Sequence, residues 1–213
     1  MVSIRDVAIR AGVSTTTVSH VINRTRYVSE ELTSRVNNAM RELDYRPNTL
    51  ASGLRSGKTK TIGLIVPDIS NQFFAEVSRK IEDNGFENGY SVILCNSDDD
   101  WKKEKNYIDV LVAKQVDGII FISAGEESEN LNKALEFDLP IVLVDRDIRN
   151  VNVDIVLVDN KSGGFNATQY LIELGHNRIG CIAGPSPVTP SAMRVEGFKQ
   201  ALQEAKLAVD PAL

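Results

Sequence analysis

A run of short polar side chains between residues 14 and 23 has the composition of a surface that reads DNA. Hydroxyl, imidazole and amide groups of this size can exchange hydrogen bonds with base edges and phosphates, and none would block close approach to a groove. Three consecutive threonines are poor helix formers, so an ordinary solvated helix face would gain nothing from them. The alternative is a helix cap followed by a polar surface. We predict DNA contacts from Ser14, Thr15, Thr16, Thr17, Ser19, His20 and Asn23.

Two short helices are expected to position these side chains. Ser3 and Asp6 form a capping-box-like start, and an apolar stripe with helical spacing follows them. Gly12 can adopt the left-handed backbone that ends a helix, and Ser14 can cap the next one. The inner face of that second helix would be Val18, Val21 and Ile22. Two short helices joined by a tight glycine-containing turn predict a helix-turn-helix, whose second helix lies in the major groove.

A third helix is expected from Ser29 to about Leu43, and it would complete a small three-helix core. The polar loop before it carries Arg24, which could lie along phosphates. Tyr45 follows the helix and has two open roles. Its hydroxyl could meet a phosphate, or its ring could simply close the core.

The first sixty residues resemble the DNA-binding domain of the LacI family of bacterial repressors. The matching stretches read SIRDVAIRAGVSTTTVSHVIN, VSEEL, LDYRPN and LASGLRSGKT, and residues 14–23 are especially similar to the purine and ribose repressors. The resemblance implies a homodimer on a double-stranded palindromic operator, with a hinge helix within residues 47–60 that enters the minor groove. It assigns further DNA contacts to Ala51, Leu54 and Arg55, with Leu54 as the side chain that levers open a central base step.

From Thr61 onward, short apolar runs alternate with amphipathic segments, which predicts a parallel sheet flanked by helices. Strands are expected at residues 62–66, 91–95, 118–122, 141–144, 155–158 and 179–183. Helices are expected at residues 73–88, 102–114, 128–137, 163–174 and 194–205. In the first of these helices, Phe74, Val77, Ile81 and Phe86 are expected to face inward. Ligands of such sheets bind at the carboxyl ends of the strands.

Four loops that follow strands carry groups suited to a sugar. Flat aromatic faces can stack on a sugar ring, while charged and amide groups can bind its hydroxyls. The combination resembles the fold shared by periplasmic sugar-binding proteins and LacI-family effector domains, including ribose-binding members. The resemblance places Asn71, Phe73 and Phe74 on one side of the effector, Asp145 and Arg146 at its hydroxyls, and Asp159 and Arg194 in the other lobe.

These assignments have structural alternatives. Phe74 could belong to the core, and Arg146 could pair with neighbouring aspartates. Arg194 could only tie down its own loop. Many ribose repressors carry a second arginine two residues before the position of Arg194, where this chain has Ala192. Ribose, another sugar and, with less support, a purine are therefore the candidate effectors.

Charge separates the two parts of the chain. Residues 1–60 hold 10 Lys and Arg against 5 Asp and Glu, whereas residues 61–213 hold 14 against 24. A basic head on an acidic body suits contact with a polyanion through the head alone. The sequence has no signal peptide and no apolar run long enough to cross a membrane, so a cytoplasmic protein without membrane contact is expected.

Motifs for catalysis or cofactor binding are absent from the sequence. It contains no P-loop, dinucleotide fingerprint, nucleophile elbow or zinc-protease motif, and His20 and His176 lie far apart. Cys95 and Cys181 each lie in an apolar run, which favours two buried thiols over a disulfide. The carboxylate run at residues 98–100 lacks calcium-loop spacing and is expected to be a solvated loop. We therefore predict no catalytic residue, metal or cofactor.

Together these features predict an all-α helix-turn-helix domain (residues 1–46), a hinge helix and linker (47–60), and an α/β parallel-sheet effector domain with lobes at 61–161 and 162–213. The second lobe would be incomplete, because family members continue past the position of Leu213. The chain would then be a fragment or a natural truncation. The predicted function is effector-modulated repression from operator DNA. The alternatives are a regulator that binds DNA or dimerises without sensing ligand, and a sugar-binding protein without a DNA role.

Overall fold

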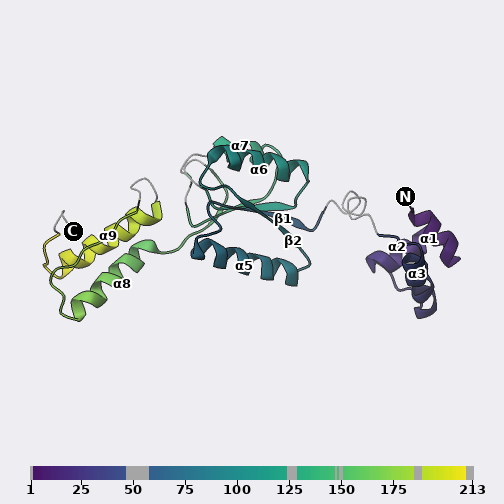
Figure 1. The fold of residues 1–213 in the computed structure, drawn as a ribbon, viewed down its shortest axis with the longest axis horizontal. Coiled ribbons are helices and arrows are strands. Elements are labelled where there is room, and N and C mark those ends of the chain that lie inside the picture. The colour runs from purple at the N-terminus through teal and green to yellow at the C-terminus, as the bar shows by residue number, and fades with distance from the viewer. Residues whose placement is uncertain are drawn as a thin grey trace. The chain divides into compact units, whose positions relative to one another are not determined.

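The computed structural model describes residues 2–46, 58–123, 129–146, 148, 151–184 and 189–209. The chain divides into two compact units, residues 1–57 and residues 58–213. The first unit is helical and the second is built on a parallel sheet (Figure 1). The predicted fold class is therefore confirmed. Along the described residues, no helix combines the length and apolar character that crossing a membrane requires.

The helical unit contains α1 (Ile4–Ala11), α2 (Thr15–Asn23) and α3 (Glu30–Glu42). Their ends are set by the predicted capping residues. Ser3 and Asp6 form a complete capping box before α1, and Gly12 ends that helix with a φ of 64°. Ser14 and Ser29 cap α2 and α3, because each side chain accepts a hydrogen bond from a first-turn N–H. The turn between α1 and α2 is thus fixed by residues adjacent in sequence.

An apolar core joins the three helices. Its buried side chains are Val7, Ala8, Ala11, Val18, Val36 and Ala39. The predicted inner residues Val21 and Ile22 pack against this core while half-buried, as do Met40 of α3 and its C-cap residue Leu43. α3 packs mainly against α1 and only slightly against α2. Among the described helices of this unit, none therefore covers the remaining side of α2.

Five strands form the sheet of the second unit: β1 (Thr61–Val66), β2 (Ser91–Asn96), β3 (Gly118–Phe121), β4 (Ile141–Val144) and β5 (Asp154–Val156). They lie in the order β2-β1-β3-β4-β5, and every neighbouring pair is parallel. Parallel neighbours need crossover connections, which the intervening helices largely supply. All carboxyl ends of the strands consequently lie along one edge of the sheet.

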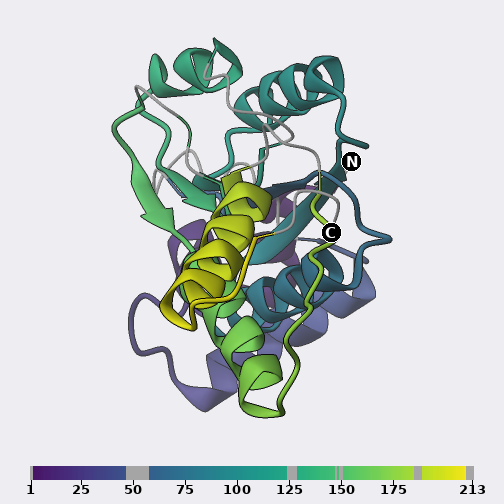
Figure 2. The same ribbon diagram turned by 90° about the vertical axis from the view of Figure 1, so that its left-hand side faces the viewer.

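Helices cover both faces of this sheet. α5 (Gln72–Glu87) lies on one face, while α6 (Trp101–Ala113) and α7 (Glu129–Leu135) lie on the other (Figures 1 and 2). Between the sheet and α6 and α7 is the larger core, which includes Ile65, Leu111, Phe121 and Leu143. Gly63 lets α6 approach β1 closely, because a Cβ on this glycine would lie 2.5 Å from the Leu111 side chain.

Phe86 does not face inward as predicted; its side chain is 77% exposed. The inner stripe of α5 includes Phe74, Val77 and Ile81 and continues to Gly85 rather than to its aromatic neighbour. Gly85 is buried because α5 approaches β2 there, and a Cβ at this position would lie 3.0 Å from Val92. One residue in a helix is a rotation of about 100°, so Phe86 is turned to solvent.

α8 (Asn160–Glu173) and α9 (Thr189–Glu204) follow the sheet and lie side by side (Figures 1 and 2). Gly164 and Gly197 stand where the two helices cross. A Cβ at Gly197 would overlap the carbonyl oxygen of Lys161, and one at Gly164 would overlap the carbonyl oxygen of Arg194. Two glycines therefore permit close backbone approach. After α8, Gly175 has a left-handed conformation, with a φ of 87°.

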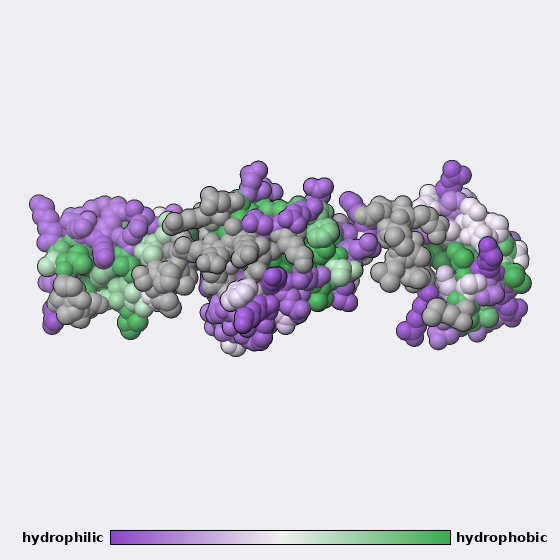
Figure 3. Space-filling view, turned by 90° about the horizontal axis from the view of Figure 1, so that it is seen from above, coloured by the Kyte–Doolittle hydropathy of each residue, from purple (hydrophilic) through white to green (hydrophobic). Residues whose placement is uncertain are grey.

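The strand predicted at residues 179–183 is absent from the structure, which gives this segment no regular hydrogen-bonded form. A strand requires a neighbour to pair with, and none of the five strands extends to this segment. Ile182 is fully exposed and Cys181 is half-buried, while Cys95 in β2 is buried, and both thiols are free. Figure 3 shows exposed apolar residues in the region of α8 and α9, at the left of the view.

Candidate nucleic-acid interface and effector site

The polar residues of α2 divide into those used by the fold and those left available. Ser14 caps the helix, and its hydroxyl also lies 2.9 Å from the hydroxyl of Thr17, so both groups are engaged within the chain. Thr15 and Thr16 are exposed, and neither hydroxyl is hydrogen-bonded within the part of the chain that the structure describes. Two hydroxyls at the helix N-terminus are therefore free to bond an external partner.

The other end of α2 is more strongly tied to the protein. His20 Nδ1 lies 2.7 Å from Thr25 Oγ1, and the Asn23 amide donates to the Ser19 carbonyl oxygen at 2.9 Å. Arg24 follows in the left-handed conformation, with a φ of 51°, and its side chain is exposed. These contacts fix the loop after α2 and leave the Arg24 guanidinium in solvent.

The remaining predicted DNA contacts lie at or beyond the end of the helical unit. Tyr45 is half-buried and packs against the three-helix core, which is compatible with the core-closing alternative and leaves its phosphate contact a prediction. Ala51, Leu54 and Arg55 lie outside the described residues.

At the carboxyl edge of the sheet, Asp145 stands directly after β4 in a strained conformation. Its φ is 68°, a value that residues with a side chain rarely adopt. Its N–H donates to the carbonyl oxygen of Val156, which holds the turn in place. Burial raises the pKa of the Asp145 carboxyl, against the positive charges of Arg146 and Arg194. Strain and an incompletely solvated charge at one residue are features of functional positions.

Arg146 carries a nearly buried cation beside this carboxylate. Its side chain is only 14% exposed; Nη1 donates to the Ser123 carbonyl oxygen at 2.5 Å and lies 3.9 Å from the Asp99 carboxylate. Its Nε atom is buried, and none of the described residues accepts a hydrogen bond from it. A buried donor without an acceptor is costly, so this atom points to a water or ligand oxygen as its natural partner.

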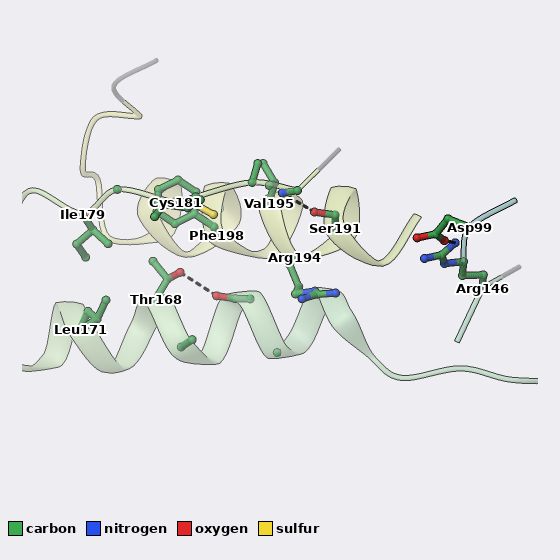
Figure 4. A pocket seen from close by; sticks show the side chains of 17 residues that line it. Asp99, Arg146, Thr168, Leu171, Ile179, Cys181, Ser191, Arg194, Val195 and Phe198 are labelled. Atoms are coloured by element: carbon green, nitrogen blue, oxygen red, sulfur yellow. Dashed lines mark hydrogen bonds and ion pairs between the residues drawn. The ribbon is translucent and has the colours of Figure 1, made fainter. Parts of the chain in front are cut away.

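A cavity of about 800 Å³ lies between α8, α9 and residues 179–184, with Asp99 and Arg146 at one edge (Figure 4). Arg194 extends from α9 toward α8 in this view, and its Nε donates to the Pro190 carbonyl oxygen at 3.1 Å. The cavity is lined mostly by apolar groups with a few charged ones at the edge. Apolar walls with few polar groups are typical of small-molecule sites.

Among the predicted effector residues, Arg146 and Arg194 line this cavity, whereas Asp145, Asn71, Phe73, Phe74 and Asp159 do not. Asn71 caps α5 by accepting from the Phe73 N–H at 3.0 Å. Phe73 is 41% exposed, whereas Phe74 is buried in the core, and the two rings meet edge to face with centroids 5.2 Å apart. Asp159 caps α8 by accepting from the Ser162 N–H, and hydrogen bonding with the side chain and then the backbone of Ser162 lowers the pKa of its carboxyl. Their contact with an effector stays a prediction.

Asp99 lies in the carboxylate run expected to be a solvated loop, and its side chain is 61% exposed; the sequence pattern did not indicate that it would lie near Arg146. The three carboxylates have different roles: Asp98 pairs with Lys103, Asp100 caps α6, and Asp99 lies near Arg146. The location of the run could have indicated this proximity. The run follows β2, and the carboxyl ends of all the parallel strands lie along one edge of the sheet. Among the described residues, no group of three or more His, Cys, Asp or Glu could hold a metal ion.

A helix-turn-helix unit followed by a binding-protein-like parallel sheet defines a class of bacterial regulatory proteins. Residues 3–48 match the model for bacterial regulatory proteins of the lacI family, and residues 59–211 match the model for periplasmic binding proteins and the sugar binding domain of the LacI family. The second match alone covers well over half of the chain. The protein belongs to the LacI family.

Known proteins are similar to this chain across both of its units. The HTH-type transcriptional repressor PurR of Histophilus somni (strain 2336) is 43% identical over 212 residues, which cover 99% of this chain and 64% of the repressor. A LacI transcriptional regulator from Alkaliphilus metalliredigens QYMF, complexed with D-xylulofuranose, is 37% identical with a TM-score of 0.64 over 71% of this chain and 55% of its own. The Lac repressor bound to ONPG is 26% identical, with a TM-score of 0.79 over 97% of this chain and 63% of its own. This chain therefore spans less than two thirds of the length of these relatives.

Proposed function

We propose that this chain belongs to a transcription repressor that binds a double-stranded palindromic operator as a homodimer. The observation that carries the proposal is the pair of free, exposed hydroxyls of Thr15 and Thr16 at the N-terminus of α2. In a helix-turn-helix, the first residues of the second helix are those that contact base edges. The basic balance of residues 1–60 supplies attraction to phosphates.

A small-molecule effector, a sugar such as ribose, would modulate this binding. Support comes from Arg146, whose buried Nε has no acceptor among the described residues, and from Asp145 beside it. A guanidinium donor and a carboxylate acceptor together can bind neighbouring sugar hydroxyls. A ligand that binds one arrangement of the effector domain better than another shifts the population toward that arrangement, and the hinge would carry the shift to DNA.

The test uses the whole chain and a palindromic duplex obtained by selection from a randomised pool with a fixed central CG step. Binding is measured by fluorescence anisotropy across a range of salt concentrations, without ligand and with ribose, hypoxanthine or guanine. We expect tight, salt-sensitive binding that ribose changes and the purines do not. A change with a purine alone would replace the sugar proposal and retain the repressor.

Two other outcomes separate the remaining alternatives. Binding that is indifferent to every ligand would indicate a regulator that recognises DNA without sensing. Failure to select any duplex, together with ribose binding measured by the fluorescence of Trp101, would indicate a sugar-binding protein without a DNA role. Trp101 is the only tryptophan of the chain and begins α6, two residues from Asp99, so it is a suitable reporter.

A further inference from the structure

A contact between α3 and the turn that precedes α2 has no part in the proposed base contacts. The Arg35 guanidinium donates from Nε to the carbonyl oxygen of Ala11 at 3.1 Å and from Nη2 to that of Gly12 at 3.2 Å. Both oxygens belong to the C-terminal end of α1, where backbone carbonyls lack partners within the helix. A cation at this end is also favoured by the helix dipole. Arg35 thus closes the turn from a helix distant in sequence.

Gly12 leaves space for the Arg35 guanidinium. Its φ of 64° already favours glycine, and a Cβ here would lie 2.6 Å from Nη2 of Arg35, so any other residue would displace the guanidinium from its present position. The helix-turn-helix glycine therefore provides both the left-handed backbone and room for a guanidinium above the turn. A single planar group bonded to two successive carbonyls restrains the direction in which the chain leaves α1.

That direction determines where α2 lies. α3 packs mainly against α1 and only slightly against α2, so α2 is held by its packing against α1 across the turn and by its few core residues. Val18 is its one fully buried side chain. Fixing the turn from α3 therefore restrains a helix that α3 itself hardly contacts.

We propose that Arg35 is a positioning residue for DNA recognition: it sets the placement of α2 by bonding the Ala11 and Gly12 carbonyls and does not itself contact phosphate. The inference rests on the proposed function, because placement of α2 has a functional readout only if α2 reads DNA. Its structural part, restraint of the turn, can be measured without DNA.

The experiment compares the full chain with Arg35→Lys and Arg35→Ala and with the matched controls Arg41→Lys and Arg41→Ala. Lysine keeps the charge but cannot form the planar two-donor contact. Arg41 is an exposed arginine of the same helix, and within the described residues its side chain bonds only the Asn37 carbonyl and the Asn38 amide oxygen, both in α3. Amide hydrogen exchange is followed at residues 12–17, and binding to the selected palindromic duplex and to a scrambled duplex is measured across salt concentrations.

Arg35→Lys is expected to speed exchange at residues 12–17 and to lower the preference for the selected duplex about ten-fold, the discrimination that one well-placed base contact supplies. Both Arg35 variants should keep the salt dependence of binding, as should the Arg41 controls. If Arg35 instead contacted a phosphate, Arg35→Lys would retain DNA affinity. Arg35→Ala would then reduce the slope of log affinity against log salt concentration by about one. Either of those results, or unchanged exchange in Arg35→Lys, would overturn the proposal.

Two further outcomes are also decisive. If no duplex can be selected for the unmodified chain, the repressor proposal fails, and the exchange data alone decide whether Arg35 restrains the turn. If Arg35→Lys speeds amide exchange throughout α1, α2 and α3 and not mainly at residues 12–17, Arg35 is a stability residue, and the positioning role is wrong.

Discussion

At the scale of single residues, Asp145 combines backbone strain with a carboxyl that is costly to ionise. Burial raises its pKa, so the folded chain binds this proton more tightly than the unfolded chain. Its contribution to stability is therefore greatest below the ordinary aspartate value and falls as pH rises through the raised pKa. Near neutral pH the ionised carboxylate destabilises the fold, which is tolerable if binding requires it.

Replacing Asp145 with asparagine tests this trade-off. Asp145→Asn removes the charge and keeps the shape, so we expect a higher melting temperature at pH 7 and weaker ribose binding. Differential scanning fluorimetry and Trp101 fluorescence measure the two effects. In the unmodified chain, acidification should abolish ribose binding at a higher pH than an ordinary aspartate would. A lower melting temperature in Asp145→Asn would show that the charge stabilises the fold.

A substitution of Arg146 tests the donor side of the same candidate site. Arg146→Lys keeps a positive charge near Asp99 but removes the buried Nε donor, so we expect ribose affinity to fall by about ten-fold or more, the usual effect of losing a hydrogen bond to a charged group. Arg79→Lys, an exposed arginine on α5, is the control and should bind ribose normally. Equal ribose affinity in both variants would remove Arg146 from the effector site.

At the scale of elements, the contact between α6 and β1 depends on Gly63. Gly63→Ala would place a methyl group 2.5 Å from Leu111, and overpacking of this kind costs about 1–3 kcal/mol. Gly163 in α8 is the control, because no atom lies within 4 Å of its added Cβ and alanine favours helix by up to about 1 kcal/mol. Urea unfolding of both variants should therefore show opposite signs. No loss of stability in Gly63→Ala would mean that α6 moves freely.

The sequence predicted elements best where their determinants are local. Ser3, Gly12 and Ser14 act within one helical turn, so the helix-turn-helix could be placed to within a residue or two. Phe86 was misassigned because a pattern of apolar residues favours a phenylalanine over the adjacent Gly85, whereas close approach of α5 to β2 selects the glycine. The strand at residues 179–183 was predicted from composition, but pairing partners are a property of the whole sheet.

The candidate site was predictable in part for the same reason. Asp145 and Arg146 follow a clear apolar strand, and the parallel sheet puts such positions at one edge. The proximity of Asp99 to Arg146 joins loops from two different strands, and the orphaned Nε depends on how deeply the side chain is buried. The engagement of Ser14, Thr17 and Asn23 within α2 likewise became visible only in three dimensions.

At the scale of the whole molecule, the chain combines a basic helical unit with an acidic α/β unit. Attraction to DNA then comes from the first unit and weakens with salt. Arg24 is exposed at the end of α2, so Arg24→Ala should reduce the slope of log affinity against log salt by about one. Lys206→Ala, an exposed cation of the second unit, should leave the slope unchanged. Equal slopes in all three proteins would argue against Arg24 as a phosphate contact.

The most direct test of the central claim is the specificity of a chain whose α2 has lost its free hydroxyls. The double variant Thr15→Val and Thr16→Val keeps shape and helix propensity, while Ser34→Ala removes an exposed hydroxyl from α3 as the control. We predict that the double variant loses its preference for the selected palindrome over a scrambled duplex by about ten-fold or more, with the salt slope unchanged. Full preference in the double variant would contradict base reading by α2.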